Sequence, residues 1–411
     1  MKILQINNYH YLKGGSEKVY FETSSLLEEK GHKVIFFSTG NEKNLKTKYE
    51  KYFVKPTNYN SSKIVDKIMS VHNFIYSKKA KKNLEKLILD EKPDIAHLHI
   101  FYGHLTSSIL PILKKYNIPT VMSIHEYRLM CPTYLMQDIN GNNCELCANG
   151  NYFNCIFKKC NKGSFSKSFI SALECFIRDY FFNYVDFIDK FILVSKFIYN
   201  KHKQYNKIPE NKMIQLYNFI DINNYKFEVN KGNYYLYVGR LSVEKGIMTL
   251  VKAFHNIPNI NLKIAGIGPM ERDIVDYVKR NNIQNIQLLG FCNKEYLEEL
   301  IHNAIFTIIP SEWYENNPMS VLESFAYGTP VIGSNIGGIP ELIIPEKTGY
   351  LFSPGDIEDL QKIILYSYDI SINDYKDMSL NARKLIEDEF NKDKYYEELI
   401  KIYKSLLSKL I

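Results

Sequence analysis

Short apolar runs recur along the chain, separated by polar loops and by amphipathic segments. The runs occupy 3–6, 34–37, 93–99, 120–124 and 192–195 in the first half, and 234–238, 262–265, 286–289, 306–309, 331–333 and 348–352 in the second. Such short runs are typical of strands buried in a parallel sheet. The segments between them, such as 16–30 and 78–89, repeat apolar residues with the period of a helix. This alternation predicts a doubly wound α/β fold.

The stretch from Phe306 to Glu341 holds the clearest local signal. A buried strand is followed by a loop and then by Asn317 and Pro318, the pair expected at a helix N-cap and at its first helical position. A helix to about Tyr327 and another strand complete the unit. We therefore expect a helix N-terminus at the carboxyl edge of a parallel sheet, where backbone N–H groups and the helix dipole attract phosphate.

Two carboxylates flank this helix start, Glu315 in the loop and Glu323 in the helix. A carboxylate can accept two hydrogen bonds from vicinal hydroxyls, as on a ribose or a hexose. One acid could hold a ribose and the other a sugar, with phosphate between them at the helix end. The alternative is two solvated acids beside a surface helix.

Cationic and histidine side chains follow other predicted strands. Arg240 and Lys245 lie five residues apart in the loop after 234–238, where both can converge on a diphosphate. On a surface turn, the same two residues would simply be solvated. His99 and His125 each end a strand, and either can donate a hydrogen bond to a sugar hydroxyl or a leaving-group oxygen, or serve only as a structural residue. A Gly14-Gly15 pair before the first helix suits either a phosphate or a plain turn.

Four of the seven cysteines form the pattern C-x2-C-x7-C-x4-C, at Cys144, Cys147, Cys155 and Cys160, with Cys131 upstream. In a reducing compartment, this cluster indicates structural zinc held by thiolates. Free thiols and an iron–sulfur cluster on the same ligands are the alternatives.

These motifs resemble those of retaining glycosyltransferases of the GT-B fold, specifically family 4. The stretch 306–341 resembles the donor-site signature, and residues 239–246 resemble the phosphate-binding G-R-L-x-x-E-K-G. Residues 14–17 resemble G-G-x-E, and residues 266–269 match the last four positions of A-G-x-G-P. Residues 218–221 depart from the family's N-G-x-D because the glycine is absent.

The resemblance implies two doubly wound, Rossmann-like domains facing a cleft. We expect an acceptor-binding domain over 1–205 with a cysteine-rich insertion at about 128–165, and a nucleotide-sugar domain over 206–390. A C-terminal helix, 391–411, is expected to pack back on the first domain. The insertion resembles one found in a subset of polysaccharide-type members.

The resemblance also implies roles for individual residues. Glu323 is expected to hold the ribose, Glu315 the transferred sugar, and His125 is the strand-end histidine beside that sugar. The other implied donor contacts are Gly15, Arg240 and Lys245 at the diphosphate, Gly268 and Phe291 near the nucleotide, and the backbone of Asn317, Pro318, Met319 and Ser320.

The implied reaction moves a sugar from a UDP- or GDP-type nucleotide diphosphate sugar to a glycan or lipid-linked acceptor, in cell-surface polysaccharide synthesis. Front-side attack would retain the anomeric configuration. No Asp-x-Asp motif occurs in the donor region, so we expect no catalytic divalent ion. A nucleotide-sugar epimerase and an inactive scaffold that uses the cysteine module for interactions are the competing hypotheses.

Charge and composition limit the classes of binding partner that we expect. The formal net charge of +7 is mild for 411 residues and no basic arm occurs, so nucleic-acid binding is not indicated. The chain opens directly with a strand and has no apolar run long enough to span a bilayer, so we expect a cytoplasmic enzyme, with the inner face of the membrane as one option. Lysines before the aromatic stretch 165–191 suggest a membrane-surface patch, whereas the alternative is an ordinary core helix.

Overall fold

The structure is a computed structural model that describes residues 1–56 and 64–408, including their side chains except those of 64–69. The chain divides into two compact units. The first unit comprises Met1–Ile139, Cys144–Leu216 and the chain from Tyr395 onward. The second unit comprises Asn140–Asn143 and Tyr217–Lys394.

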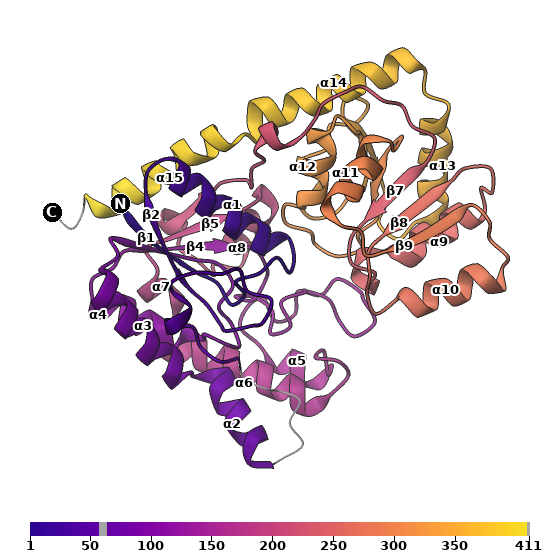
Figure 1. Ribbon diagram of the computed structural model, residues 1–411. Coiled ribbons are helices and arrows are strands. Elements are labelled where there is room, and N and C mark those ends of the chain that lie inside the picture. The colour runs from indigo at the N-terminus through magenta and orange to yellow at the C-terminus, as the bar shows by residue number, and fades with distance from the viewer. Residues whose placement is uncertain (57–63, 409–411) are drawn as a thin grey trace. The chain divides into compact units, whose positions relative to one another are not determined.

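The first unit is built on a parallel sheet in the order β2-β1-β3-β4-β5-β6. Its strands are β1 (Lys2–Ile6), β2 (Lys33–Phe37), β3 (Ile95–Leu98), β4 (Thr120–Ile124), β5 (Lys190–Leu193) and β6 (Met213–Gln215). Its helices are α1 (Gly15–Glu29), α2 (Ile64–Ile75), α3 (Lys78–Glu91), α4 (Leu110–Lys115), α5 (Phe153–Phe157), α6 (Phe165–Phe181), α7 (Tyr184–Phe187) and α8 (Lys196–Gln204), as Figure 1 shows.

The second unit repeats this plan with a parallel sheet in the order β12-β11-β10-β7-β8-β9. Its strands are β7 (Tyr235–Val238), β8 (Leu262–Ala265), β9 (Ile286–Gly290), β10 (Thr307–Ile309), β11 (Val331–Ser334) and β12 (Gly349–Phe352). Its helices are α9 (Ile247–His255), α10 (Glu271–Arg280), α11 (Lys294–His302), α12 (Met319–Ala326), α13 (Ile357–Tyr368) and α14 (Ile372–Glu389).

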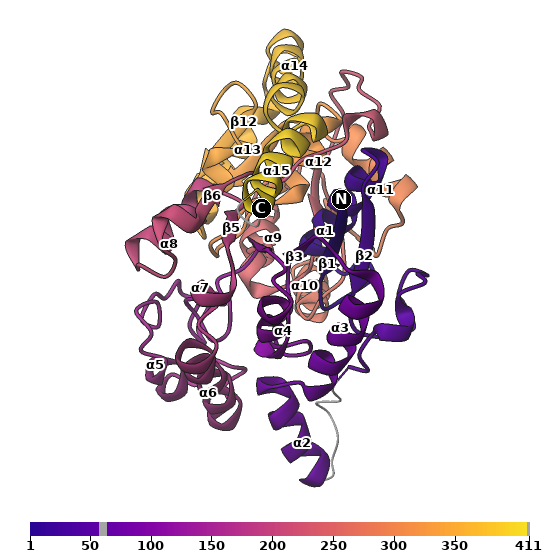
Figure 2. The same cartoon turned by 90° about the vertical axis from the view of Figure 1, so that its left-hand side faces the viewer.

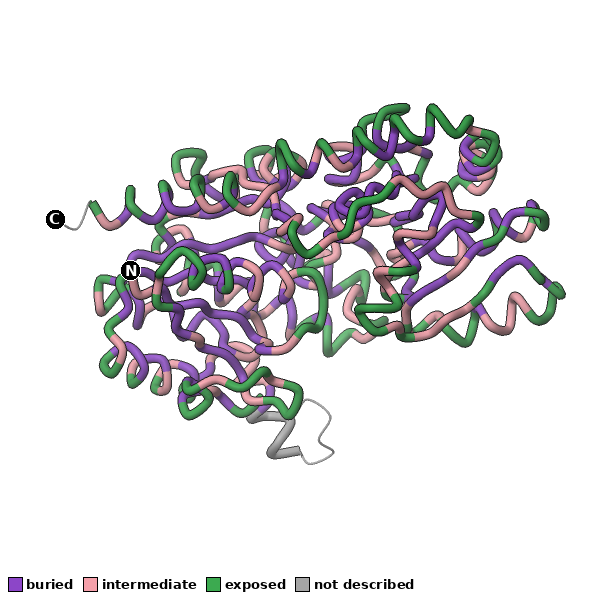
Figure 3. Tube along the Cα trace, turned by 45° about the horizontal axis from the view of Figure 1, so that its top comes forward, coloured by how far each residue is buried: buried purple, intermediate pink, exposed green. Residues whose placement is uncertain are grey.

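The core of the second unit lies on both faces of its sheet, because successive side chains of a strand point to opposite faces. Tyr235 and Tyr237 of β7 pack into one apolar cluster with α9, α10 and α13, whereas Tyr234 and Leu236 pack into another with α11. Burial on both faces explains why the strands read as continuous apolar runs. Figure 3 shows buried stretches, in purple, along the Cα trace of both units.

The predicted fold class, two doubly wound α/β domains, is confirmed by these two sheets. One strand was not predicted. The run 192–195 reads as the last strand of the first sheet, but β6 follows it and pairs with β5. β6 has only three residues, too few to give a recognisable pattern, and it shifts the division between the units from 205/206 to 216/217.

The last helix, α15 (Lys392–Leu407), joins the first unit from Tyr395 onward. Its tyrosines make polar contacts with that unit: Tyr395 Oη lies 3.2 Å from Thr23 Oγ1, and Tyr403 Oη lies 2.7 Å from His97 Nδ1. Within the part of the chain that the structure describes, no helix is long and apolar enough to cross a bilayer.

An ion pair is buried beneath α6. Arg128 Nη2 lies 2.5 Å from Glu174 Oε2, and both side chains are 6% exposed. Arg178 of the same helix donates from Nη1 to the Arg128 carbonyl at 2.8 Å. Arg128 therefore forms a buried polar cluster with Glu174 and Arg178 on the inner side of this helix.

We expect Glu174→Gln to destabilise the first unit by about 3 kcal/mol, because it leaves the Arg128 guanidinium buried without its counter-charge. Urea denaturation followed by circular dichroism would measure the change. Glu210→Gln is the matched control, since Glu210 pairs with Lys203 at 2.7 Å on the exposed surface and should matter little. Equal effects of the two substitutions would contradict a structural role for the buried pair.

Candidate functional site

The second sheet has a topological switch point between β7 and β10. The chain runs outward from β7 to β8 and β9, and then returns to place β10 on the other side of β7. Ligands in open α/β sheets bind outside the carboxyl ends of the strands at such points. The loops after β7 and β10 are the ones that carry Arg240, Lys245 and Glu315.

At this point, Lys245 and Glu315 form a direct ion pair. Lys245 Nζ donates to Glu315 Oε1 at 2.5 Å, and Ser311 Oγ donates to the same oxygen at 2.7 Å. Burial alone would raise the pKa of Glu315, but the Lys245 ammonium and these hydrogen bonds lower the pKa below its ordinary value. Glu315 is therefore an ionised acceptor held inside the site. Trp313 adds a cation–π contact, with its ring centroid 5.3 Å from Lys245 Nζ.

Two glycines allow the loops around this pair to approach one another closely. Gly246 has φ +66°, and a Cβ there would lie 1.8 Å from the Pro310 carbonyl oxygen. Gly337 has φ +62°, and its Cβ would lie 2.3 Å from the Glu315 carbonyl oxygen. A side chain at 246 would push the loop after β7 away from the loop after β10 and so separate Lys245 from Glu315. A side chain at 337 would push the loop after β11 away from the Glu315 backbone.

The helix after this loop, α12, begins one residue later than the sequence predicts. Pro318 is its N-cap and Met319 its first residue, so the expected N-cap role of Asn317 is wrong. The Asn317 side chain is used elsewhere, because its Oδ1 accepts the Asn218 N–H at 3.1 Å. Sequence reasoning assigned nothing to Asn218, since the motif around it lacks the family's glycine.

The other predicted donor-site residues of the second unit follow the same edge of the sheet. Gly268 follows β8 and Phe291 follows β9, and Phe291 is 78% exposed. Arg240 is exposed after β7, and Glu323 is half-buried on α12, as is Ser320. The loops after β7 and β8 are joined by the Leu241 N–H, which donates to the Ile267 carbonyl at 3.1 Å.

The first sheet has its own switch point, between β1 and β3. Gly15 starts α1 after the loop that follows β1, and Gly14 is the N-cap. Glu17 in the first turn of α1 is buried and lies 3.4 Å from Asn7 Nδ2, which donates to its carboxylate. Burial raises the pKa of Glu17, even though hydrogen bonds oppose that shift.

A chain of histidines crosses the carboxyl ends of β3 and β4. His99 Nε2 lies 3.0 Å from Gln5 Oε1, and His99 Nδ1 lies 3.0 Å from His125 Nε2. Burial lowers the pKa of His125 to about 4 and that of His99 well below its ordinary range, so both rings are neutral. Each neutral ring has one donor and one acceptor nitrogen.

The partners fix which nitrogen of each ring carries the proton. Gln5 Oε1 can only accept, so the proton of His99 is on Nε2 and its Nδ1 accepts from His125 Nε2–H. His125 Nδ1 is then an acceptor, which suits a ligand hydroxyl that donates. Next to it, burial raises the pKa of Glu126 to about 7, a titratable group that sequence reasoning did not single out.

The cysteines lie near one another within the first unit. Cys147 and Cys155 belong to one small buried cluster, and Cys160 packs against it. The Cys160 N–H donates to the Cys155 carbonyl at 3.1 Å, where Lys159 with φ +50° ends α5. Among the side chains that the structure describes, no three His, Cys, Asp or Glu residues are placed to hold a metal ion. The zinc site on Cys144, Cys147, Cys155 and Cys160 stays a prediction.

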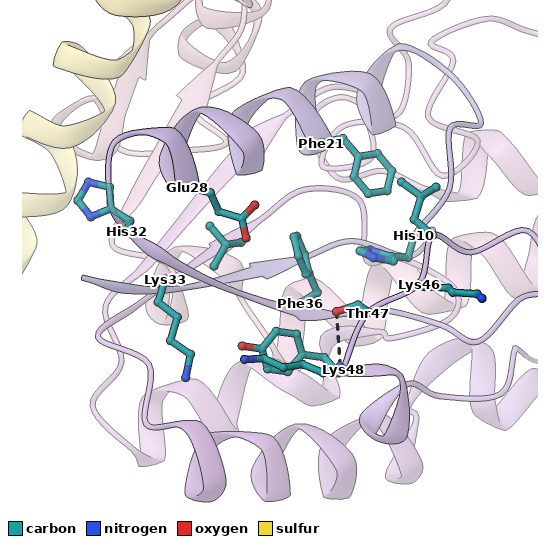
Figure 4. A pocket seen from close by; sticks show the side chains of 12 residues that line it. His10, Phe21, Glu28, His32, Lys33, Phe36, Lys46, Thr47 and Lys48 are labelled. Carbon is teal, nitrogen blue, oxygen red and sulfur yellow. Dashed lines mark hydrogen bonds between the residues drawn. The ribbon is translucent and has the colours of Figure 1, made fainter.

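A pocket of about 440 Å³ lies elsewhere, along the edge strand β2 (Figure 4). His10, Phe21 and Phe36 line one part of it, and Lys33 and Lys48 another. None of its lining residues belongs to the motifs above, and it lies beside β2 rather than at a switch point. We therefore do not assign the predicted donor to it.

Comparisons with known proteins agree with this fold and these motifs. The family model described as Glycosyltransferase Family 4 matches residues 13–224, and the one described as Glycosyl transferases group 1 matches residues 220–385. The first match covers more than half of the chain. The chain belongs to glycosyltransferase family 4.

Two relatives show how far the similarity extends. An uncharacterized 42.6 kDa protein in the cps region of Klebsiella pneumoniae is 25% identical over 98% of this chain and 100% of its own length. An uncharacterized glycosyltransferase of Methanocaldococcus jannaschii is 32% identical over 45% of this chain, and the match spans about half of that relative, 52%.

Solved structures share the fold at low sequence identity. Sucrose-phosphate synthase from Thermosynechococcus elongatus superposes with a TM-score of 0.74 at 17% identity, covering 100% of both chains. Anabaena HepE in complex with UDP and glucose superposes with a TM-score of 0.68 at 16% identity, covering 98% of this chain and 100% of its own. These likenesses establish the GT-B architecture.

We expect Lys245→Met to lower the free energy of unfolding by about 2 kcal/mol at neutral pH, because Glu315 would stay buried without its cation. In the unmodified protein the folded-state pKa of Glu315 is lowered, so its contribution is present above the unfolded pKa and lost as pH falls. In the variant, burial would raise the pKa of Glu315. Acidification should therefore narrow the difference in the free energy of unfolding between the variant and the unmodified protein. Urea denaturation from pH 8 down to pH 5 measures the free energy of unfolding of both proteins. Lys245→Arg keeps the positive charge and is the control. A loss of stability in Lys245→Met that does not depend on pH would contradict the pairing.

We expect His99→Phe to change the proton position on His125, because the substitution removes the ring nitrogen that accepts from His125 Nε2–H. Two-bond proton–nitrogen NMR correlations report the protonated nitrogen of each imidazole. The signals of His125 should shift from a single tautomer toward a mixture. His255→Phe, on α9 of the second unit, should leave them unchanged. An unaltered His125 pattern in a folded His99→Phe protein would rule out this positioning role.

Proposed function

We propose that this protein is a retaining glycosyltransferase that moves a sugar from a nucleotide diphosphate sugar to a hydroxyl of a glycan or of a lipid-linked acceptor. The observation that carries the proposal is the Lys245–Glu315 ion pair at the switch point of the second sheet, next to the N-terminus of α12. A buried acid and a cation beside a helix N-terminus suit a ligand that carries both hydroxyls and phosphate.

Each group in the second unit has a proposed role. Arg240 and Lys245 would neutralise the diphosphate, as the leaving group requires. Glu315, which its surroundings keep ionised, would accept hydrogen bonds from the transferred sugar. Glu323 would hold the ribose hydroxyls, and the backbone of 317–320 would contact phosphate and sugar. Gly268 and Phe291 would lie near the nucleotide.

The first unit would bind the acceptor and would add Gly15 and His125 to the donor contacts. Gly15, at the N-terminus of α1, suits a phosphate oxygen, because glycine there lets the backbone approach it closely. His125 would lie beside the transferred sugar. The presence of UDP and glucose in the Anabaena HepE structure supports a UDP-type donor, with a GDP-type donor as the alternative. The similarity to a protein of a cps region supports a role in cell-surface polysaccharide synthesis.

The transfer is proposed to proceed by front-side attack. The bond from the anomeric carbon to the diphosphate oxygen breaks as a bond to the acceptor oxygen forms on the same face. The acceptor proton moves to an oxygen of the departing diphosphate. The protein then contributes position and charge, with Arg240 and Lys245 stabilising the leaving group.

We expect the purified chain to bind UDP or GDP by calorimetry and to release it from the matching nucleotide sugars. Glu323→Ala should weaken that binding roughly 10- to 100-fold, because a charged acceptor of the ribose hydroxyls is lost. Glu358→Ala, at an exposed acid in the first turn of α13, is the control and should bind as before. Failure of every nucleotide to bind would overturn the proposed function, and unchanged affinity in Glu323→Ala would overturn the ribose assignment.

A further inference from the structure

The helix α6 of the first unit buries several polar residues. Ser168, Ser171, Glu174 and Arg178 lie on its buried side with Ala172 and Cys175. Charged groups are seldom so deeply buried, and here the ion pair with Arg128 compensates for it. The exposed side of such a helix is normally polar, but on α6 it carries several aromatic rings besides Lys167 and Asp179.

The outward side of α6 is aromatic. Phe165, Phe169 and Tyr180 recur with the spacing of one helix face, and Phe181 lies beside them. Tyr180 is 83% and Phe181 is 65% exposed. Isolated exposed apolar residues are ordinary, but exposed aromatic rings gathered at both ends of one helix, with a partly exposed Phe176 between them, mark an interaction surface.

The short helix α5 extends this surface. α5 packs beside α6, as both Figure 1 and Figure 2 show, and the Phe153 ring lies 5.1 Å from that of Phe176 on α6. Phe157 at the end of α5 is 77% exposed. We call the combined surface the aromatic face; its members are Phe153, Phe157, Phe165, Phe169, Tyr180 and Phe181.

Lysines accompany the aromatic face. Lys158, Lys159 and Lys162 lie between α5 and α6, Lys167 lies in the first turn of α6, and all four are exposed. No Asp or Glu occurs from residue 146 to residue 173, so this segment carries only positive charge. Its chemistry therefore combines aromatic rings with several ammonium groups.

We propose that the aromatic face docks the protein on an anionic lipid surface. Aromatic rings are favoured at the level of lipid headgroups, and lysines beside them attract anionic phosphate. A second copy of the chain fits less well, because a two-fold interface would bring the four lysines of each copy toward those of the other. The inner face of α6 is already packed on the unit, so the helix would lie along the membrane surface.

The test uses the full chain and two kinds of vesicle, one of phosphatidylcholine and one of equal parts phosphatidylcholine and phosphatidylglycerol. We expect the chain to sediment with the anionic vesicles, and to be released by raised salt. Phe157→Ser, Phe169→Ser and Tyr180→Ser combined should weaken binding about tenfold or more. The control combines Leu89→Ser, Leu365→Ser and Ile372→Ser, which replace exposed apolar residues elsewhere and should not affect binding.

A second set of substitutions tests the charge. Lys158→Gln, Lys159→Gln and Lys162→Gln should reduce binding and its salt dependence, whereas Lys347→Gln, Lys362→Gln and Lys376→Gln, also exposed, should have a weaker effect. Phe169→Trp adds a probe to a chain with a single tryptophan, and its emission should shift to the blue with anionic vesicles. Ile372→Trp should show no shift.

Three outcomes would overturn the proposal. The first is that the chain does not bind vesicles, and the second is that the aromatic substitutions leave vesicle binding unchanged. The third is that the chain forms a concentration-dependent dimer, and that the aromatic substitutions abolish this dimer but not vesicle binding. None of these measurements involves a nucleotide or a donor-site residue. Failure here therefore leaves the proposed transfer reaction untouched, and failure of nucleotide binding leaves this surface untouched.

Discussion

A carboxylate buried as deeply as that of Glu315 stays ionised only when it is paired with a cation. In the second unit this pairing joins the loop after β10 to the loop after β7. Lys245 is 70 positions away in the sequence and comes from the loop after β7, whereas Glu315 comes from the loop after β10. The two meet because the sheet places β10 beside β7 and because the glycine at 246 lets the loops after these strands touch. The same order of strands that builds the core therefore builds the charged site.

The first unit applies the same topological rule to different chemistry. Its switch point also gathers side chains from loops after adjacent strands, but the groups there are neutral imidazoles in a hydrogen-bonded row rather than an ion pair. Burial keeps His99 and His125 uncharged, and Gln5 sets the direction of their protons. The second unit thus offers fixed charge of the kind a diphosphate needs, while the first unit offers oriented neutral hydrogen-bonding groups of the kind a hydroxyl needs.

Much of this arrangement could be predicted from the sequence, since continuous apolar runs identify buried strands and the loops after them carry the polar residues. Two kinds of feature could not be predicted: contacts between distant residues and very short strands. Asn317 has the local pattern of an N-cap, but its side chain accepts from the distant Asn218, which a local pattern cannot reveal. β6 is too short to produce a periodic signal. Arg240 and Lys245 were assigned together to a diphosphate, and only the fold shows that Lys245 pairs with Glu315.

The helix α6 exposes a further limit of pattern reading. Helical periodicity shows which residues share a face, but it does not show how far each is buried, and on α6 charged residues are buried beside Ala172 and Cys175 while several aromatic rings are exposed. Burying Glu174 and Arg178 costs desolvation that an apolar interior would avoid. Leaving aromatic rings in water adds a second cost. Both costs fall on α6, and the exposed rings of Phe153 and Phe157 on α5 add to the second one. The stability of the isolated chain does not account for a helix that buries charged groups on one side and exposes aromatic rings on the other. Contact with a lipid surface would remove the aromatic rings from water and would give the neighbouring lysines a counter-charge.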